Sequence, residues 1–570
     1  MRILGIEGTA WAASAAVYDS GTDAVFVESD PYQPESGGIH PREAAEHMRE
    51  AIPRVVETAL DEAAAMADDE RPPVDAVAFS KGPGLGPCLR IVGTTARSLA
   101  GTLDVPLVGV NHMVAHLEVG RHQSGFDSPV CLNASGANAH VLGYRNGRYR
   151  VLGETMDTGV GNALDKFTRH VGWSHPGGPK VEAHAADGEY VPLPYVVKGM
   201  DFSFSGIMSA AKQAYDDDTP VEDVCFSLQE TVFAMLAEVA ERALSLTGSD
   251  ELVLGGGVGQ NARLREMLAE MCEARAASFY APDPRFLRDN AGMIAILGAK
   301  MYDADDTLPV EESAVDPDFR PDQVPVTWRE AEPWREHGGG AADESAVRGA
   351  EATVELGPSR VYKRRRPKAY RHPALDERLR RRRTREEVRL TSEARRAGVP
   401  TPVVSDVDLD SFAIAFETVG DADLREYVAG EAPDDDPARS ATDDLALAAV
   451  ADVGRHLATI HGAGFVHGDP TTRNVRVSRR DADATGRADE HEARSHRTYL
   501  IDFGLGYYSD DVEDYAMDLH VFAQSLTGTA GDPAPLLAAV EDAYREAGDH
   551  GVLDQLREIE GRGRYRPGPN

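Results

Sequence analysis

HGDPTTRN, residues 467–474, and IDFG, residues 501–504, are the stretches of sequence that decide the fold of the C-terminal third of this chain. Asp469 stands five residues before Asn474, and Asp502 opens the D-F-G turn. Phosphoryl transfer from ATP needs one base or positioning group and two magnesium ligands, and this spacing supplies all three. We therefore predict an α+β protein-kinase-like domain in which Asp469 is the catalytic group and Asn474 and Asp502 hold magnesium.

The segment upstream of these motifs supplies a lysine and a choice of two glutamates. VELGPSRVYKRRR places Lys363 at the end of a predicted strand, where the lysine of kinases holds the α and β phosphates of ATP. TREEVRL follows on a predicted helix, and either Glu386 or Glu387 could form the ion pair with that lysine. No G-x-G-x-x-G precedes Lys363 and no A-P-E follows the D-F-G, so the sequence departs from ordinary protein kinases.

The composition of the chain is strongly acidic. Its 570 residues hold 59 Lys and Arg against 95 Asp and Glu, which gives a formal net charge of −36 at pH 7. Surfaces rich in Asp and Glu stay hydrated when salt screens their mutual repulsion, so we expect a protein of a halophilic cytoplasm. An ordinary acidic mesophilic protein is the alternative. No uncharged apolar run reaches the length of about 18 residues that a membrane-spanning helix needs, so no membrane association is predicted.

Two domains and a linker are predicted along the chain. Residues 1–325 alternate short apolar strands with helical stretches, which is typical of an α/β domain. Residues 326–346 mix proline, glycine and charge without periodicity, as a linker does. Residues 347–570 form the kinase-like domain that carries the motifs above.

Two histidines in NHMVAH are candidate metal ligands. His112 and His116 are four residues apart and would lie on one face of a helix, where their imidazoles could converge on a metal. Asp289, in RDNAGMIA, could be a third ligand, and the set would suit Fe(II) or Zn(II). The alternatives are a packing pair of histidines and an aspartate that caps a helix. The zinc-protease motif H-E-x-x-H is absent, which argues against peptide hydrolysis.

Five glycine-rich turns in the first domain predict a nucleotide cleft. Glycines at strand ends let backbone N–H groups approach phosphates closely, and a following helix adds its positive N-terminal end. Each turn alone is a weak signal, but together they favour a nucleotide site. The turns are GIEGTA (5–10), KGPGLGPCLRIVGTTA (81–96), NASGAN (133–138), HPGGPKVE (175–182) and GGGVGQN (255–261).

The order of the strings in the first domain points to a known family. GIEGTAW, GPGLGPCLR, GVNHMVAHLE, SGAN, DKFTRHVG, HPGGPKVE, FSFSG, GGGVGQN and RDNAGMIA follow one another in residues 1–325. With them the domain resembles the universal tRNA threonylcarbamoyladenosine transferases, the catalytic subunit of the KEOPS complex. The resemblance implies a duplicated α/β fold of the actin-like type, found in sugar kinases and heat-shock ATPases. It also implies transfer of the threonylcarbamoyl group from threonylcarbamoyl-AMP to N6 of adenosine 37 in tRNAs reading codons that begin with A.

The same resemblance assigns roles to individual residues. It makes His112, His116 and Asp289 metal ligands. Asn133 stands where archaeal relatives usually have a tyrosine that can reach the metal, so that a water or the substrate could replace this fourth ligand. The residues implied to contact threonylcarbamoyl-AMP are Asn133, Ala134, Ser135, Gly136, Ala137, Asp165, Gly178, Glu182 and Asn261.

A second resemblance covers the C-terminal domain. RGAEA, KRRRPKAYRHPALDERLRRRRTREE and GVPTP, together with the kinase motifs, resemble the small atypical kinase subunit of the same KEOPS complex, which some archaea carry fused to the transferase. The resemblance favours Glu387 over Glu386 as the partner of Lys363. It implies a Ser/Thr kinase or ATPase that uses Mg-ATP and regulates KEOPS, with other small KEOPS subunits as partners.

Basic charge is concentrated in residues 363–385 of this otherwise acidic chain. Arginine persists here where the rest of the sequence avoids cations, and the product of the implied reaction is a modified tRNA. We therefore predict that the run binds tRNA, and the alternative is a solvated helix face. The predicted contacts are Arg380, Arg381, Arg382 and Arg383.

The sequence leaves two other functions open. In one, the first domain is a metal-dependent glycoprotease fused to a kinase, which the missing glutamate between the histidines disfavours. In the other, the kinase-like domain is only a scaffold that docks tRNA and partners, although its set of lysine, aspartates and asparagine is complete. Both protein phosphorylation and simple ATP hydrolysis are compatible with the second domain.

Overall fold

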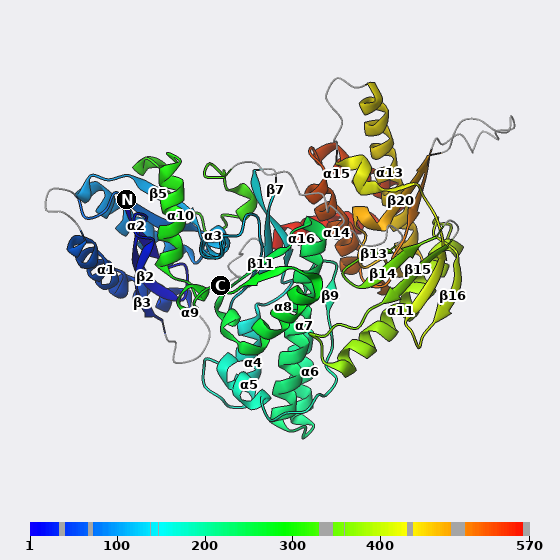
Figure 1. The fold of residues 1–570 in the computed structure, drawn as a ribbon, viewed down its shortest axis with the longest axis horizontal. Coiled ribbons are helices and arrows are strands. Elements are labelled where there is room, and N and C mark those ends of the chain that lie inside the picture. Colours follow the sequence, from blue (N-terminus) through cyan, green and yellow to red (C-terminus); the bar gives the residue numbers. More distant parts are fainter. Residues whose placement is uncertain are drawn as a thin grey trace. The chain divides into compact units, whose positions relative to one another are not determined.

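The chain forms two compact units, which Figure 1 draws as a ribbon. The first unit comprises Met1–Val197, Asp201–Gly338 and Ala369–His372, and the second comprises Lys198–Met200, Gly339–Lys368 and Pro373–Asn570. Most of the predicted linker, residues 330–345, lies outside the described residues. The computed structural model describes residues 1–32, 40–66, 72–136, 138–145, 147–329, 346–357, 360–429, 437–479 and 496–562.

A five-stranded mixed sheet opens the first unit. The strands β1, β2 and β3 are antiparallel neighbours, whereas β1, β4 and β5 run parallel, in the spatial order β3-β2-β1-β4-β5. Helices cover both faces of the central strands, and this burial explains why β1 and β4 are almost continuously apolar. The bounds are β1 (Arg2–Glu7), β2 (Ala12–Asp19), β3 (Ala24–Pro31), β4 (Ala76–Gly82) and β5 (Leu107–Asn111).

A second five-stranded sheet repeats this topology. Read as β8-β7-β6-β11-β12, it has antiparallel neighbours β6, β7 and β8 and parallel neighbours β6, β11 and β12. Order and directions match those of the first sheet strand by strand, so the duplicated α/β architecture predicted for this part of the chain is confirmed. The bounds are β6 (Val130–Ala134), β7 (Ala139–Arg145), β8 (Arg148–Glu154), β11 (Glu251–Gly255) and β12 (Ser278–Tyr280).

The helices of the first unit bury the two sheets. α1 and α2 pack on the first sheet, while α10 packs on β1, β2 and β4 and against α3. α7 is buried almost all around between Val224 and Leu244, and the buried residues include the charged side chains Glu230, Glu238, Glu241 and Arg242. The bounds are α1 (Pro41–Ala65), α2 (Gly86–Leu103), α3 (His112–Ser124), α4 (Val160–His170), α5 (Gly178–Ala185), α6 (Ser205–Asp216), α7 (Val221–Thr247), α8 (Ala262–Arg275), α9 (Pro284–Leu287) and α10 (Ala291–Asp303), with the short elements β9 (Val197–Lys198), β10 (Asp201–Phe202), η1 (Gly257–Gln260), η2 (Val310–Glu312) and η3 (Pro321–Gln323).

Two asparagine caps fix the starts of α3 and α10. The side-chain oxygen of Asn111 accepts hydrogen bonds from the backbone N–H groups of Met113 and Val114, at 3.0 and 3.1 Å. Asn290 accepts from the N–H of Met293 at 3.2 Å. Such caps satisfy N–H groups that have no partner within the helix. They hold His112 at the first residue of α3 and Asp289 just before α10.

The second unit is an α+β assembly. Its five-stranded sheet has the order β13-β14-β15-β17-β16 with antiparallel neighbours throughout. Helix α11 packs against β16 and β17 of this sheet. The rest of the unit is mostly helical, with two small sheets of order β18-β20-β21 and β19-β22. The predicted α+β class of this part is confirmed. No helix among the described residues is long and apolar enough to cross a membrane.

The elements of the second unit have the following bounds. The strands are β13 (Ala346–Arg348), β14 (Ala352–Leu356), β15 (Arg360–Arg365), β16 (Val404–Asp408), β17 (Ala413–Glu417), β18 (Ala422–Asp423), β19 (Phe465–Val466), β20 (Val475–Arg479), β21 (His496–Leu500) and β22 (Tyr507–Tyr508). The helices are α11 (Pro373–Arg396), α12 (Leu424–Val428), α13 (Pro437–Gly462), η4 (Thr472–Asn474), α14 (Val512–Thr529), α15 (Ala534–Ala547) and α16 (His550–Arg562).

Candidate functional site

Three side chains of the first unit converge as a candidate metal centre. The ligand atoms of His112, His116 and Asp289 all lie within 4.8 Å of one another. Oδ1 of Asp289 is 3.4 Å from Nε2 of His112 and 3.3 Å from Nε2 of His116. The two histidines are one turn apart on α3, and their imidazoles converge as the four-residue spacing predicted.

The electrostatics of this cluster favour a cation. Burial alone would raise the pKa of Asp289, but the imidazoles of His112 and His116 hold it well below its usual range. Burial alone would lower the pKa of His112, yet the carboxylates of Glu7 and Asp289 raise it to about 10. Two imidazoles and a carboxylate are a donor set that suits Fe(II) or Zn(II). A metal could therefore replace the proton on Nε2 of His112, the ring nitrogen that faces Asp289.

Asn133 lies near the same cluster, since a Cβ built on Gly255 would be 3.4 Å from the Oδ1 of Asn133 and 3.6 Å from the Cβ of His116. The Asn133 side chain is 2% exposed, and its Oδ1 has no hydrogen-bond partner among the described residues. A Cβ built on Gly256 would lie 2.6 Å from this oxygen, so only glycine permits the approach of the η1 turn. A buried amide oxygen without a partner fits a role toward a ligand, as predicted for this position.

Glu7 is the residue of this site that sequence reasoning missed. It is fully buried at the end of β1 and accepts hydrogen bonds from the N–H and Oγ1 of Thr9, at 2.7 and 2.6 Å, and from Oγ of Ser80. Its Oε2 also lies 3.1 Å from Nδ1 of His112. A carboxylate at Nδ1 keeps the proton on that nitrogen and leaves Nε2 for a metal. The signal in the sequence was a charged residue closing an apolar strand.

The described residues predicted to contact threonylcarbamoyl-AMP lie on β6 and the turn after it, on α4 and α5, and at the cap of α8. Asp165 of α4 accepts a hydrogen bond from the N–H of Gly177 at 2.7 Å, next to Gly178, which opens α5. Glu182 of α5 accepts from the N–H of Ala262 at 2.8 Å, next to Asn261, which caps α8. These two contacts join α4 to the α5 turn and α5 to the α8 turn.

The remaining predicted contacts follow β6. Asn133 and Ala134 end this strand, and Ser135 and Gly136 continue from it. The backbone of Gly136 lies against Gly161, where an added Cβ would be 2.7 Å from the Cα of Gly136. Ala137 lies outside the described residues.

The second unit holds the lysine and the acidic residues of the kinase motifs together. Nζ of Lys363 is 2.7 Å from Oε1 of Glu387 and 2.7 Å from Oδ1 of Asp502. Of the two neighbouring glutamates, Glu387 is the one that faces this lysine, and it is only 1% exposed. Arg365 was not predicted here, but its Nη2 lies 2.5 Å from the other carboxylate oxygen of Glu387. Burial alone would raise the pKa of Asp502, but Lys363 and Arg365 hold it far below its usual range.

The loop that carries Asp469 and Asn474 is fixed from two sides. Nδ2 of Asn474 donates to the backbone oxygen of Asp469 at 2.8 Å and lies 3.2 Å from its Oδ2. Asp518 of α14 accepts from the backbone N–H groups of His467 and Gly468, at 2.6 and 2.8 Å. The predicted pair Asp469 and Asn474 is therefore in direct contact.

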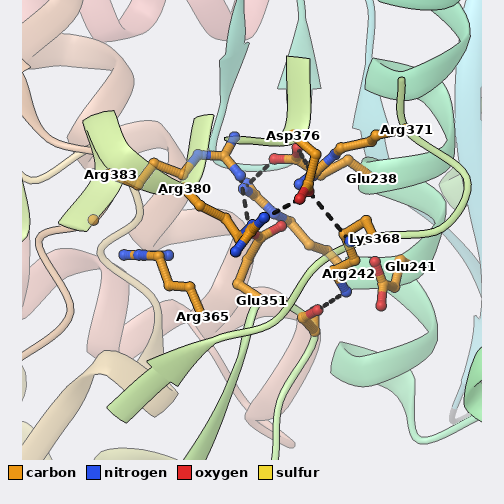
Figure 2. A network of polar contacts seen from close by, with 12 residues as sticks. Glu238, Glu241, Arg242, Glu351, Arg365, Lys368, Arg371, Asp376, Arg380 and Arg383 are labelled. Atoms are coloured by element: carbon orange, nitrogen blue, oxygen red, sulfur yellow. Dashed lines mark hydrogen bonds and ion pairs between the residues drawn. The ribbon is translucent and has the colours of Figure 1, made fainter. Parts of the chain in front are cut away.

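The arginine run is only partly on the surface. Arg383 is 2% exposed and its Nη1 lies 2.9 Å from Glu351, so it is buried and unsuited to bind RNA directly (Figure 2). Arg380 lies 2.6 Å from Asp376 and stacks on Phe412, with 4.3 Å between its guanidinium and the ring centroid. The helical period explains this division, because α11 turns every fourth residue toward the interior of the unit.

Arg381 and Arg382 lie further out on α11. Arg381 is half-buried, 3.3 Å from Glu377, and Arg382 is exposed. Earlier in the run, Arg371 belongs to the first unit, where it and Arg242 both pair with Glu238 of α7 (Figure 2). The basic surface is thus smaller than the run of residues suggested.

Comparison with known proteins identifies relatives along the whole chain. Residues 23–296 match the family described as TsaD, tRNA N6-adenosine threonylcarbamoyltransferase. A protein of Haloarcula marismortui is 66% identical over 578 residues, which span 99% of this chain and 100% of that protein. A protein of Halobacterium salinarum is 67% identical over 100% of this chain and 99% of its own length. A protein of Methanospirillum hungatei is 49% identical over 99% of each. All three are named probable bifunctional tRNA threonylcarbamoyladenosine biosynthesis proteins.

Changing Glu7 to glutamine should weaken metal binding without unfolding the protein. Loss of the carboxylate that orients a ligating histidine lowers metal affinity by about 10-fold to 100-fold. The measurement is competition with a chromogenic chelator for Zn(II), and for Fe(II) under anaerobic conditions. Glu28→Gln, an exposed carboxylate on β3 of the same sheet, is the matched control. Equal affinities of the Glu7 variant and the wild type would show that Glu7 does not orient His112.

Proposed function

Because the chain belongs to the family of bifunctional tRNA threonylcarbamoyladenosine biosynthesis proteins, we propose that its two units carry two activities. Threonylcarbamoyl transfer to tRNA adenosine is the activity of the family matched by the first unit. For the second unit we propose a Ser/Thr kinase or ATPase activity that regulates a KEOPS-type complex. The observation that carries the first activity is the convergence of His112, His116 and Asp289.

We propose that these three residues hold one Fe(II) or Zn(II), with Asn133 beside them. When bound, such an ion would supply Lewis acidity to a carbonyl oxygen. Glu7 holds the proton on Nδ1 of His112, so that Nε2 is the nitrogen offered to the ion. No glutamate stands between the histidines, where the base of a zinc protease would be, and this disfavours the glycoprotease alternative.

We propose threonylcarbamoyl-AMP as the donor and N6 of adenosine 37 as the acceptor. The amine nitrogen attacks the carbamoyl carbonyl carbon, the new C–N bond forms, the bond to the AMP phosphate oxygen breaks and the amine loses a proton. AMP is a good leaving group, so the protein mainly has to hold donor and amine in line. The residues predicted to contact the donor would supply that positioning, namely Asn133 to Gly136, Asp165, Gly178, Glu182 and Asn261.

For the second unit we propose Mg-ATP as the cofactor. Lys363 would hold the α and β phosphates, Asn474 and Asp502 would bind magnesium and Asp469 would position the attacking oxygen. The direct contacts among Lys363, Glu387 and Asp502 support this assignment over a scaffold role, since a scaffold has no need of them. Only residues 505–511 separate the D-F-G turn from α14, which leaves little room to dock a peptide and favours ATP hydrolysis.

We propose that tRNA contacts the exposed face of α11. Arg382, Arg385 and Arg389 are exposed and lie three and four residues apart, on one side of the helix. Arg389 also stacks on the half-exposed ring of Tyr508, with its guanidinium 4.4 Å from the ring centroid. The proposed tRNA contacts are therefore Arg382, Arg385 and Arg389, and the buried Arg383 is no longer among them. We also propose that other small KEOPS subunits join the chain in a halophilic cytoplasm, in keeping with its net charge of −36.

Replacing His116 with alanine should abolish tRNA modification and leave ATP turnover unchanged, because the metal would serve only acyl transfer. Purified protein is incubated with tRNA and preformed threonylcarbamoyl-AMP, and the modified adenosine is measured by mass spectrometry. His122→Ala, on the same helix but outside the cluster, should keep normal activity. Full modification by the His116 variant would contradict the metal assignment.

Replacing Asp502 with alanine should lower ATP turnover by about 100-fold or more, since magnesium loses a ligand and the phosphates lose their alignment. One round of acyl transfer from preformed threonylcarbamoyl-AMP should proceed at the normal rate. Asp510→Ala, an exposed neighbour beyond the D-F-G turn, is the control. Wild-type ATP turnover in the Asp502 variant would refute the ATP-site proposal.

Reversing the charge of Arg382 and Arg385 to glutamate should weaken tRNA binding without changing either chemical step. Each lost phosphate contact should reduce the slope of log affinity against log salt by about 0.7 to 0.9. Binding is measured over a salt series, with reversal of the exposed Arg42 and Arg49 of α1 as the control for net charge. Identical slopes for the wild type and the α11 variant would mean that the stripe is only a solvated helix face.

A further inference from the structure

Arg365 forms a second cationic contact to the glutamate of the kinase motif. Nη2 of Arg365 lies 2.5 Å from Oε2 of Glu387, while Nζ of Lys363 lies 2.7 Å from Oε1. Each carboxylate oxygen thus has its own cation. Both cations come from β15, two residues apart, and the alternation of strand residues puts their side chains on the same face.

The same guanidinium also contacts the D-F-G turn. A Cβ built on Gly504 would lie 2.0 Å from Nη2 of Arg365, so the guanidinium occupies the space that any other residue at this position would need. Asp502, two residues earlier, has a left-handed φ of 66° and forms the ion pair with Lys363. One arginine therefore lies against both α11, through Glu387, and the turn that carries the proposed magnesium ligand.

Burial makes separation of these three charged side chains energetically costly. Lys363, Arg365 and Glu387 are 8%, 4% and 1% exposed. If α11 moved away, or the turn flipped, these buried charges would lose their partners, and an unpaired buried charge is strongly destabilising. In ordinary protein kinases, one lysine and one glutamate form this ion pair, and movement of the glutamate helix makes or breaks it to turn the enzyme on or off.

The segment after the D-F-G turn is also too short for the regulatory loop of ordinary protein kinases. In ordinary protein kinases, phosphorylation of a segment after the D-F-G turn helps to set the glutamate helix and the magnesium ligand. Here residues 505–511 lead directly into α14. Something else must hold the glutamate helix and the turn in register.

We propose that Arg365 is a positioning residue that locks Glu387 and the D-F-G turn in the arrangement that binds Mg-ATP. The ATP site is then assembled without phosphorylation. This inference rests on the proposed use of ATP by the second unit. Arg365 does not touch the phosphates itself; it acts through Glu387 and the backbone at Gly504.

The test uses the full-length chain and the variants Arg365→Met and Arg365→Lys. Arg364→Met is the matched control, because Arg364 is the neighbouring arginine on the exposed face of the same strand. Binding of a fluorescent ATP analogue with and without magnesium, and steady-state ATP turnover, are measured before and after phosphatase treatment. Thermal unfolding shows whether each variant is folded.

We expect kcat of Arg365→Met to fall by at least about 10-fold, because even small misalignments of catalytic groups slow a reaction by such factors. Nucleotide binding without magnesium should change by less than about 2-fold. Lysine keeps one donor for Glu387 but not the contact with Gly504, so Arg365→Lys should recover part of kcat. The control and the phosphatase-treated wild type should keep full turnover. In a Glu387→Gln background, Arg365→Met should cost less than in the wild type, because the contact between these two side chains is already disrupted and only the contact with Gly504 remains to be lost.

Three results would overturn the inference. They are full turnover of Arg365→Met, additive losses with Glu387→Gln, and loss of wild-type turnover after phosphatase treatment. If Arg365→Met fails to fold, Arg365→Lys decides: unchanged kcat and unchanged magnesium dependence would refute a positioning role. A wild-type chain that neither binds the analogue with magnesium nor turns ATP over would instead refute the proposed ATP site itself, and the inference with it.

Discussion

The first unit's site depends on one carboxylate that is buried where no water can reach it. Glu7 joins three elements, because it closes β1 and contacts both Ser80 of β4 and His112 of α3. An ionised group in this position is tolerated only with hydrogen bonds to its oxygens, and it has them. The packing of β1 on β4 and the orientation of the candidate ligand His112 are therefore coupled through Glu7.

Features with a fixed local spacing could be read from the sequence. The four-residue interval between His112 and His116 and the five-residue interval between Asp469 and Asn474 are properties of a single helix or loop, and the structure keeps them together. The α/β class of the first unit also follows from the alternation of strands and helices, whereas its duplication was implied only by the family resemblance, and the α+β class of the second unit by its kinase motifs. In each case the deciding contacts lie close in sequence or are tied to a recurring motif.

Features that depend on tertiary packing could not be read in the same way. Spacing alone does not separate the adjacent Glu386 and Glu387; only the resemblance favoured Glu387, and the rotation of α11 turns this residue toward Lys363. Arg383 looked like its exposed neighbours, but it faces the interior of its unit and pairs with Glu351. Burial of a charge is decided by the partner, and partners distant in the chain are invisible to a local pattern.

The matching topology of the two sheets has a consequence for the candidate metal centre. α3 follows the last strand of the first repeat, β5, and α10 follows the last strand of the second, β12, after the short helix α9, so the two helices hold corresponding places in the two repeats. His112 begins one helix and Asp289 precedes the other. Neither repeat contains a complete ligand set. The candidate metal centre is therefore complete only when both repeats contribute to it, with two histidines from the helix after the first sheet and one aspartate from the segment before the helix after the second.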